Sequence, residues 1–139
     1  MFDLQECDAS FFETAPTVRS FSLDLPVPAA QVWEGLSSDT PLAWCSLLSN
    51  GRYTSRRPFG AGTNREITVA RMLDLCEEFF RWEEGRRHSF WVMQASLPMF
   101  RRFAEDYLVE PTATGCRFTW TFAFEPLPAL ARPNVAAGL

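Results

Sequence analysis

The chain has 139 residues and a formal net charge of −4 at neutral pH, and 47% of its residues are hydrophobic. This length fits a single domain, 1–139, with a core and room for a pocket. The acidic balance argues against a nucleic-acid partner, because phosphate contacts need a basic surface. No apolar run reaches the roughly 20 residues that span a bilayer, so we expect no membrane insertion. The acidic N-terminus differs from a basic secretory signal, which favours a cytoplasmic protein.

The types of residue present exclude several kinds of chemistry. All 13 basic residues are arginines, so a lysine Schiff base and a P-loop lysine are excluded. The single histidine, His88, and four widely spaced cysteines make a poor ligand set, and we predict no metal site and no cofactor. His88 follows two arginines at the exit of a hairpin, where it is either a surface residue or a catalytic imidazole.

The N-terminal half contains the predicted helices. Residues 1–16 are expected to form an irregular leader, and 17–25 to form a strand of imperfect alternation. Pro28 suits the first turn of a helix over 29–36, in which four apolar residues share one stripe. A second short helix is predicted over 39–44, where Pro41 again comes early.

From residue 47 onward the pattern is typical of strands and turns. Turn signals at Glu84-Gly85 and Thr114-Gly115 indicate hairpins. The spacing leaves no room for helices between the strands, so the sheet must be an antiparallel meander. The predicted strands are 52–56, 63–69, 73–82, 88–96, 103–110 and 116–124.

The last predicted strand has two different faces. Phe118, Trp120, Phe122 and Phe124 alternate with mostly polar residues. This alternation indicates a sheet that is buried on one side. The aromatic side must be covered, and the two predicted helices are too short to cover it alone.

Several segments together resemble the SRPBCC (START/Bet v 1-like) superfamily, and within it the polyketide cyclase/dehydrase-type group. The resemblance implies an α+β helix-grip fold. In it, a curved antiparallel sheet of about seven strands, with two short helices after the first strand, grips a C-terminal helix over an apolar cavity. The matching segments are Pro28-Ala-Ala-Gln-Val-Trp33, Pro58-Phe-Gly-Ala-Gly-Thr63, Glu77-Glu-Phe-Phe-Arg-Trp-Glu-Glu-Gly-Arg86, Phe103-Ala-Glu-Asp-Tyr-Leu-Val-Glu-Pro111 and Gly115-Cys-Arg-Phe-Thr-Trp120.

The C-terminal segment departs from that family pattern. Pro133 interrupts 126–139, so a helix here could last only about two turns. We therefore expect a truncated or incomplete C-terminal helix. Either the helix is short, or further residues complete it, or another chain covers the cavity.

Strand alternation selects the candidate cavity residues. If the aromatic side of the last strand faces inward, three charged residues also point into the apolar cavity, and they must pair or meet a polar ligand group. The structural alternatives are an Arg–Glu ion pair that closes one end of the barrel, or a rim position in water. The ligand-binding candidates are Arg65, Glu78, Phe80, Phe90, Phe103, Glu105, Tyr107, Trp120 and Phe122.

Three functions fit these features. The first is binding of a small, largely hydrophobic or aromatic molecule in the cavity. The second, suggested by the resemblance, is a polyketide cyclase/dehydratase-type enzyme, for which no catalytic residue is assigned. The third is an interaction module whose inner face is completed by a partner chain or by a homodimer. Fold alone does not decide among them.

Overall fold

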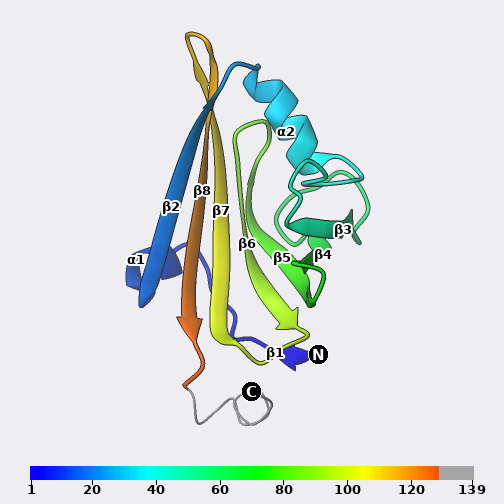
Figure 1. Ribbon diagram of the computed structural model, residues 1–139, viewed down its shortest axis with the longest axis vertical. Coiled ribbons are helices and arrows are strands. Elements are labelled where there is room, and N and C mark those ends of the chain that lie inside the picture. The colour runs from blue at the N-terminus through cyan, green and yellow to red at the C-terminus, as the bar shows by residue number, and fades with distance from the viewer. Residues whose placement is uncertain (129–139) are drawn as a thin grey trace.

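The computed structural model of the protein describes residues 1–128 and consists mainly of one antiparallel sheet (Figure 1). Its strand order is β2-β8-β7-β6-β5-β4-β3, and the short β1 pairs with β6. Two short helices, α1 (Phe11–Thr14) and α2 (Ala29–Ser37), complete the structure. The strands are β1 (Phe2–Asp3), β2 (Thr17–Leu25), β3 (Leu48–Tyr53), β4 (Asn64–Val69), β5 (Leu73–Glu83), β6 (Arg87–Ala95), β7 (Phe100–Thr112) and β8 (Gly115–Pro126).

The predicted fold class is confirmed, since an antiparallel sheet with two short helices curls into the half-barrel of the helix-grip fold. Strand β2 has the predicted bounds and pairs with β8 along its whole length. The predicted hairpin at Gly85 is also present, and this glycine has the positive φ (80°) that its turn requires. The C-terminal helix was predicted for 126–139; Pro126 is the last residue of β8, and residues 129–139 lie outside the described part of the chain.

The helix predicted over 39–44 is wrong, because the chain forms turns there. Leu42 has a φ of 61°, in the left-handed region that helices avoid. Its amide N–H donates to the carbonyl of Gly35 at 3.1 Å, which folds this segment back onto the end of α2. The apolar Leu42 side chain becomes fully buried as a result.

The expected irregular leader, 1–16, also needs correction, because it contains β1 and α1. Phe11 of α1 is buried on the outer face of the sheet, in a small cluster with Ala104 and Ala123. The small side chains of these two alanines leave room for the aromatic ring. Burial of that ring holds the leader against the outside of β7 and β8.

Two irregularities in strand pairing curl the sheet. Phe79 pairs with Phe90, and Arg81 pairs with Ser89, so Phe80 is an extra residue on β5. A second shift on the same pair of strands leaves Met93 extra on β6. Such bulges bend a strand and increase its twist. Here they turn β3, β4 and β5 toward the inner face of β7 and β8 (Figure 1).

The main core lies on this inner face, under α2. Trp33 and Leu36 of α2 are buried, as the predicted apolar stripe requires. The Trp33 indole also donates to Glu84 at 2.9 Å, which ties the helix to the β5–β6 hairpin. Farther along the same inner face, Phe21 and Leu23 of β2 remain exposed.

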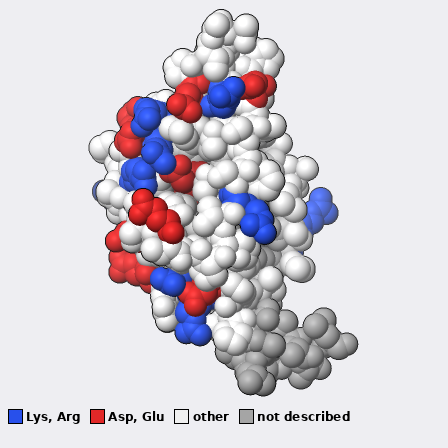
Figure 2. Space-filling view, turned by 90° about the vertical axis from the view of Figure 1, so that its left-hand side faces the viewer, with Lys and Arg blue, Asp and Glu red and all other residues white. Residues whose placement is uncertain are grey.

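The outer surface carries charges of both signs. On the face shown in Figure 2, acidic and basic side chains are interspersed, with uncharged surface between them. This mixture differs from the broad basic surface that phosphate backbones require. Among residues 1–128, no helix is long and apolar enough to cross a membrane.

The inner core yields a matched test of burial. Phe79 is 1% exposed and Phe21 is 61% exposed, so Phe79→Ala should lower the free energy of unfolding by about 3–5 kcal/mol. Phe21→Ala should change it by only about 0.5 kcal/mol. Urea unfolding of both variants checks this. Equal effects would contradict the assigned inner core.

Candidate functional site

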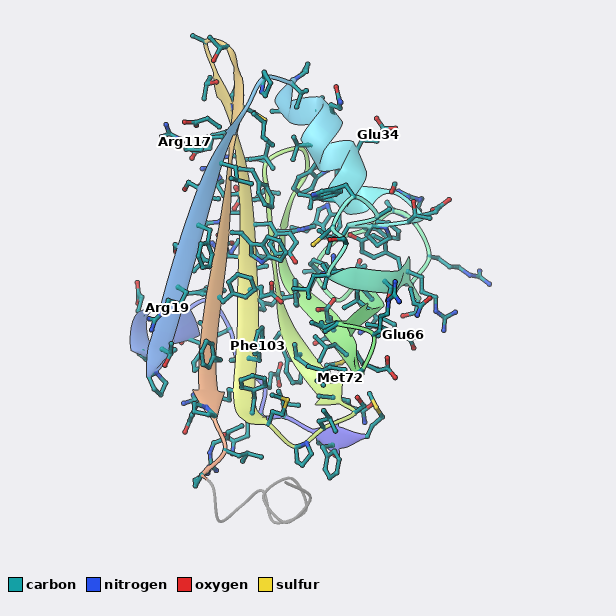
Figure 3. The ribbon with its side chains drawn as sticks, viewed as in Figure 1. Arg19, Glu34, Glu66, Met72, Phe103 and Arg117 are labelled. Atoms are coloured by element: carbon teal, nitrogen blue, oxygen red, sulfur yellow. The ribbon has the colours of Figure 1, made fainter. Side chains whose placement is uncertain are left out.

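The inner face of the sheet encloses a cavity of about 250 Å³. Its wall is apolar except at four residues, Arg65, Glu77, Glu105 and Tyr107. Figure 3 shows the side chains that fill the region between β7, where Phe103 is labelled, and β3 to β5. The apolar lining residues are Leu4, Leu42, Leu47, Leu48, Ile67, Val69, Leu73, Leu75, Val92, Ala95, Met99, Phe100, Phe103, Trp120 and Phe122.

An ion pair lies in this wall. Arg65 of β4 is directly opposite Glu77 of β5 in the strand register, so both side chains point to the same face of the sheet. Arg65 Nε donates to Glu77 Oε1 at 2.7 Å, and the two side chains are 0% and 1% exposed. Burial raises the pKa of the Glu77 carboxyl, and the adjacent guanidinium opposes this rise. Because arginine stays charged, Glu77 is its counter-ion.

Aromatic rings surround the other side of the guanidinium. Its central carbon lies 4.7 Å from the ring centre of Phe90 and 5.1 Å from that of Phe79, both within cation–π range. The rings of Tyr53 and Tyr107 are slightly farther, each at 5.9 Å. Within residues 1–128, Arg65 Nη1 and Nη2 have no hydrogen-bond partner. The guanidinium therefore retains unused capacity to donate hydrogen bonds.

Glu105 of β7 is the second carboxyl group of the cavity. Its Oε1 accepts the Trp120 indole N–H at 2.5 Å and the Tyr107 hydroxyl at 3.4 Å. Burial and the nearby Glu77 together raise the pKa of Glu105 to about 8, although the two hydrogen bonds and Arg65 oppose the rise. Glu105 is therefore mostly protonated at neutral pH.

His88 is buried, contrary to the surface position that its place after a hairpin favours. It pairs with Tyr107 across β6 and β7, and its ring packs against Trp33, Phe79 and Trp82. Neither ring nitrogen has a hydrogen-bond partner among the described residues. Burial and the neighbouring Arg65 lower the pKa of His88 well below its usual value, so the ring is neutral. Within the described chain, no three potential metal ligands cluster around it or elsewhere.

The structure divides the nine predicted site residues into three groups. Six of them line the cavity: Arg65, Phe103, Glu105, Tyr107, Trp120 and Phe122. Phe90 is buried beside the cavity, against the Arg65 guanidinium. Glu78 and Phe80 lie on the opposite face, where Glu78 accepts the Trp91 indole N–H at 3.1 Å and Phe80 packs against Phe12.

The inward positions of Glu78 and Phe80 were wrong because strand β5 does not alternate uniformly. The prediction placed both residues on the same face as Trp82. The extra residue at Phe80 brings Trp82 back to the inner face, so counting backward from it in steps of two gives the wrong set. Sequence reasoning therefore missed Glu77. Counting forward from Leu75 would have found it.

A family model described as "Polyketide cyclase / dehydrase and lipid transport" matches residues 18–139 of this chain. The chain belongs to this family. An uncharacterized protein of Mycobacterium tuberculosis strain H37Rv is 36% identical over 136 residues, covering 96% of this chain and 80% of that protein. This relative is similar over nearly the whole of this chain, but its name gives no activity.

The fold of this polyketide cyclase/dehydrase and lipid transport family member also occurs in solved structures. A START superfamily protein from Mycobacterium smegmatis has a TM-score of 0.65 at 11% identity, covering 85% of this chain and 83% of its own. Ara h 8.0201 has a TM-score of 0.57 at 15% identity, covering 88% and 90%. These two matches show that the chain shares the fold of these proteins. The polyketide cyclase/dehydrase-type group suggested by the sequence is confirmed by the family model.

The buried ion pair predicts a large energetic coupling. Arg65→Met leaves Glu77 buried without its partner and should destabilise the protein by about 3–5 kcal/mol, whereas Arg65→Met with Glu77→Leu should be much milder. The neighbouring Arg52–Glu66 pair, also 2.7 Å long but 66% and 43% exposed, is the control. Arg52→Met should cost at most about 1 kcal/mol. Urea unfolding of all variants measures the coupling, and similar costs for both pairs would contradict the buried placement.

Proposed function

We propose that this protein binds a small, largely hydrophobic or aromatic molecule in the inner cavity. The observation that supports this most directly is the apolar wall of the 250 Å³ cavity, which contains a compact group of polar side chains. Ligand pockets of proteins have this composition, with a few polar groups that fix the ligand's orientation. At about 250 Å³ the cavity is slightly smaller than typical ligand pockets of roughly 300–1,000 Å³, which favours a small ligand. A cytoplasmic location is part of the same proposal.

The aromatic residues give the cavity a preference for flat or flexible apolar molecules. Phe103 and Phe122 line it from β7 and β8, and Trp120 adjoins Phe122 in a stacked arrangement with ring centres 5.1 Å apart. Such rings offer a large apolar area and lose little conformational entropy when a ligand contacts them.

An enzyme of the cyclase/dehydratase type is the second candidate. The observation that favours it is the presence of a cation, Arg65, and a titratable carboxyl, Glu105, in one apolar cavity. A carboxyl with a pKa near neutrality suits proton transfer. A binding protein and an enzyme must both first take a ligand into the cavity. Ligand uptake is therefore the feature to test first.

A homodimer that covers the exposed inner side of β2 is the third candidate. Phe21 and Leu23 are 61% and 59% exposed on the inner side of β2. A second copy that covers this strip would remove apolar surface from water.

Uptake of a fluorescent apolar probe tests the proposed function. N-phenyl-1-naphthylamine should bind the protein with increased emission, and Val92→Phe should weaken its binding about tenfold or more, because Val92 lines the cavity and the larger ring occupies part of it. Val18→Phe is the matched control, since Val18 is exposed on β2 and outside the cavity lining. Fluorescence titration measures both affinities.

If Val92→Phe binds the probe as the unchanged protein does, the probe does not use the cavity and the proposal is contradicted. Ile67→Phe provides a second blocked cavity if Val92→Phe is too unstable to study, because Ile67 lines the same wall.

A further inference from the structure

The two oxygens of the Glu105 carboxyl have different surroundings. Oε1 accepts both hydrogen bonds to this group, from Trp120 and from Tyr107. Oε2 takes part in no hydrogen bond among residues 1–128, although the side chain belongs to the cavity wall. One oxygen is thus held by the protein, and the other has no partner within the described residues.

The position of the carboxyl proton follows from this asymmetry. Four polar groups face Glu105 from the surrounding strands: Arg65 of β4, Glu77 of β5, Tyr107 of β7 and Trp120 of β8. Burial and Glu77 raise the pKa of Glu105 to about 8, so the carboxyl carries a proton below that pH. Because Oε1 already accepts two donors, the proton resides on Oε2. The group is then a hydrogen-bond donor without an acceptor.

The charge of the cavity is already balanced without a ligand. Arg65 carries one positive charge and Glu77, at 2.7 Å, carries one negative charge. A protonated Glu105 adds none. An ionised ligand would therefore bring an uncompensated charge into an apolar enclosure, which is costly. An uncharged ligand avoids this cost.

We propose that the cavity selects uncharged ligands whose polar end is a single acceptor oxygen, of the ketone, ester or amide type, that accepts a hydrogen bond from Glu105 Oε2. This inference rests on the proposed function, since it names the class of ligand for the same cavity. Nη1 and Nη2 of Arg65, which have no hydrogen-bond partner among residues 1–128, are further donor groups in the same wall. Ligands of this class supply the missing acceptor without adding charge.

Three probes of equal chain length test the selection: 2-nonanone, nonanoic acid and nonylamine. Each competes with N-phenyl-1-naphthylamine for the unmodified protein at neutral pH. We expect the ketone to displace the probe about tenfold more tightly than the other two, since it gains a hydrogen bond without burying charge.

Tighter displacement by the acid would overturn the inference, because Arg65 would then have positive charge to spare. Tighter displacement by the amine would overturn it too, because Glu105 would be ionised in the complex. If the fluorescent probe binds and none of the three displaces it, the inference fails while the proposed function stands. If the fluorescent probe itself does not bind, the proposed function fails.

The pH dependence of ketone affinity distinguishes ionisation of Glu105 from a general effect of pH on the protein. Ketone affinity should be constant below about pH 7 and fall as the pH rises through about 8, because ionisation of Glu105 removes the donor. In Glu105→Gln, which keeps an N–H donor and does not titrate, the affinity should be independent of pH over this range. Glu78→Gln is the control on the opposite face and should titrate like the unmodified protein. A fall that persists in Glu105→Gln would overturn the assignment to Glu105.

Discussion

The ion pair between Arg65 and Glu77 places a permanent charge and its counter-ion inside an apolar enclosure. Removing two ions from water costs several kcal/mol for each, and apolar residues of similar size often give equal or greater stability. The pair is therefore poorly explained by stability alone. A role in binding the polar end of a ligand explains the ion pair better. The two guanidinium nitrogens without partners within residues 1–128 support the same view.

The pair also determines what the rest of the site does. Glu77 neutralises Arg65, so the net charge of the cavity depends on whether Glu105 is ionised. The pKa of Glu105, about 8, lies close to neutral pH. Trp120 and Tyr107 fix one oxygen of Glu105, and the other has no partner in the part of the chain that the structure describes. The aromatic side of β8 thus provides both the apolar wall and, through the Trp120 indole, the orientation of the polar group.

Local patterns predicted much of this fold. Strand β2 was predicted with its correct bounds, and the aromatic alternation of β8 identified the inner face, because these two strands pair with each other without a bulge. Six cavity residues followed from the same alternation. Bulges were not predictable, since the extra residue on β5 arises from pairing with a distant strand, and it reversed the faces of Glu78 and Phe80. His88 was missed for a related reason: its burial depends on α2 packing over the hairpin, which its neighbours in sequence do not reveal.

The NMR signals of the five tryptophan indole N–H groups give the most direct test of whether a ligand binds beside the Glu105 carboxyl. Trp120 donates to Glu105 inside the cavity, and Trp91 donates to Glu78 on the opposite face. In a ¹H–¹⁵N correlation spectrum recorded during titration with 2-nonanone, the Trp120 indole signal should shift and the Trp91 signal should stay in place. A bound ketone that leaves the Trp120 signal unchanged, or shifts Trp91 instead, would contradict the account.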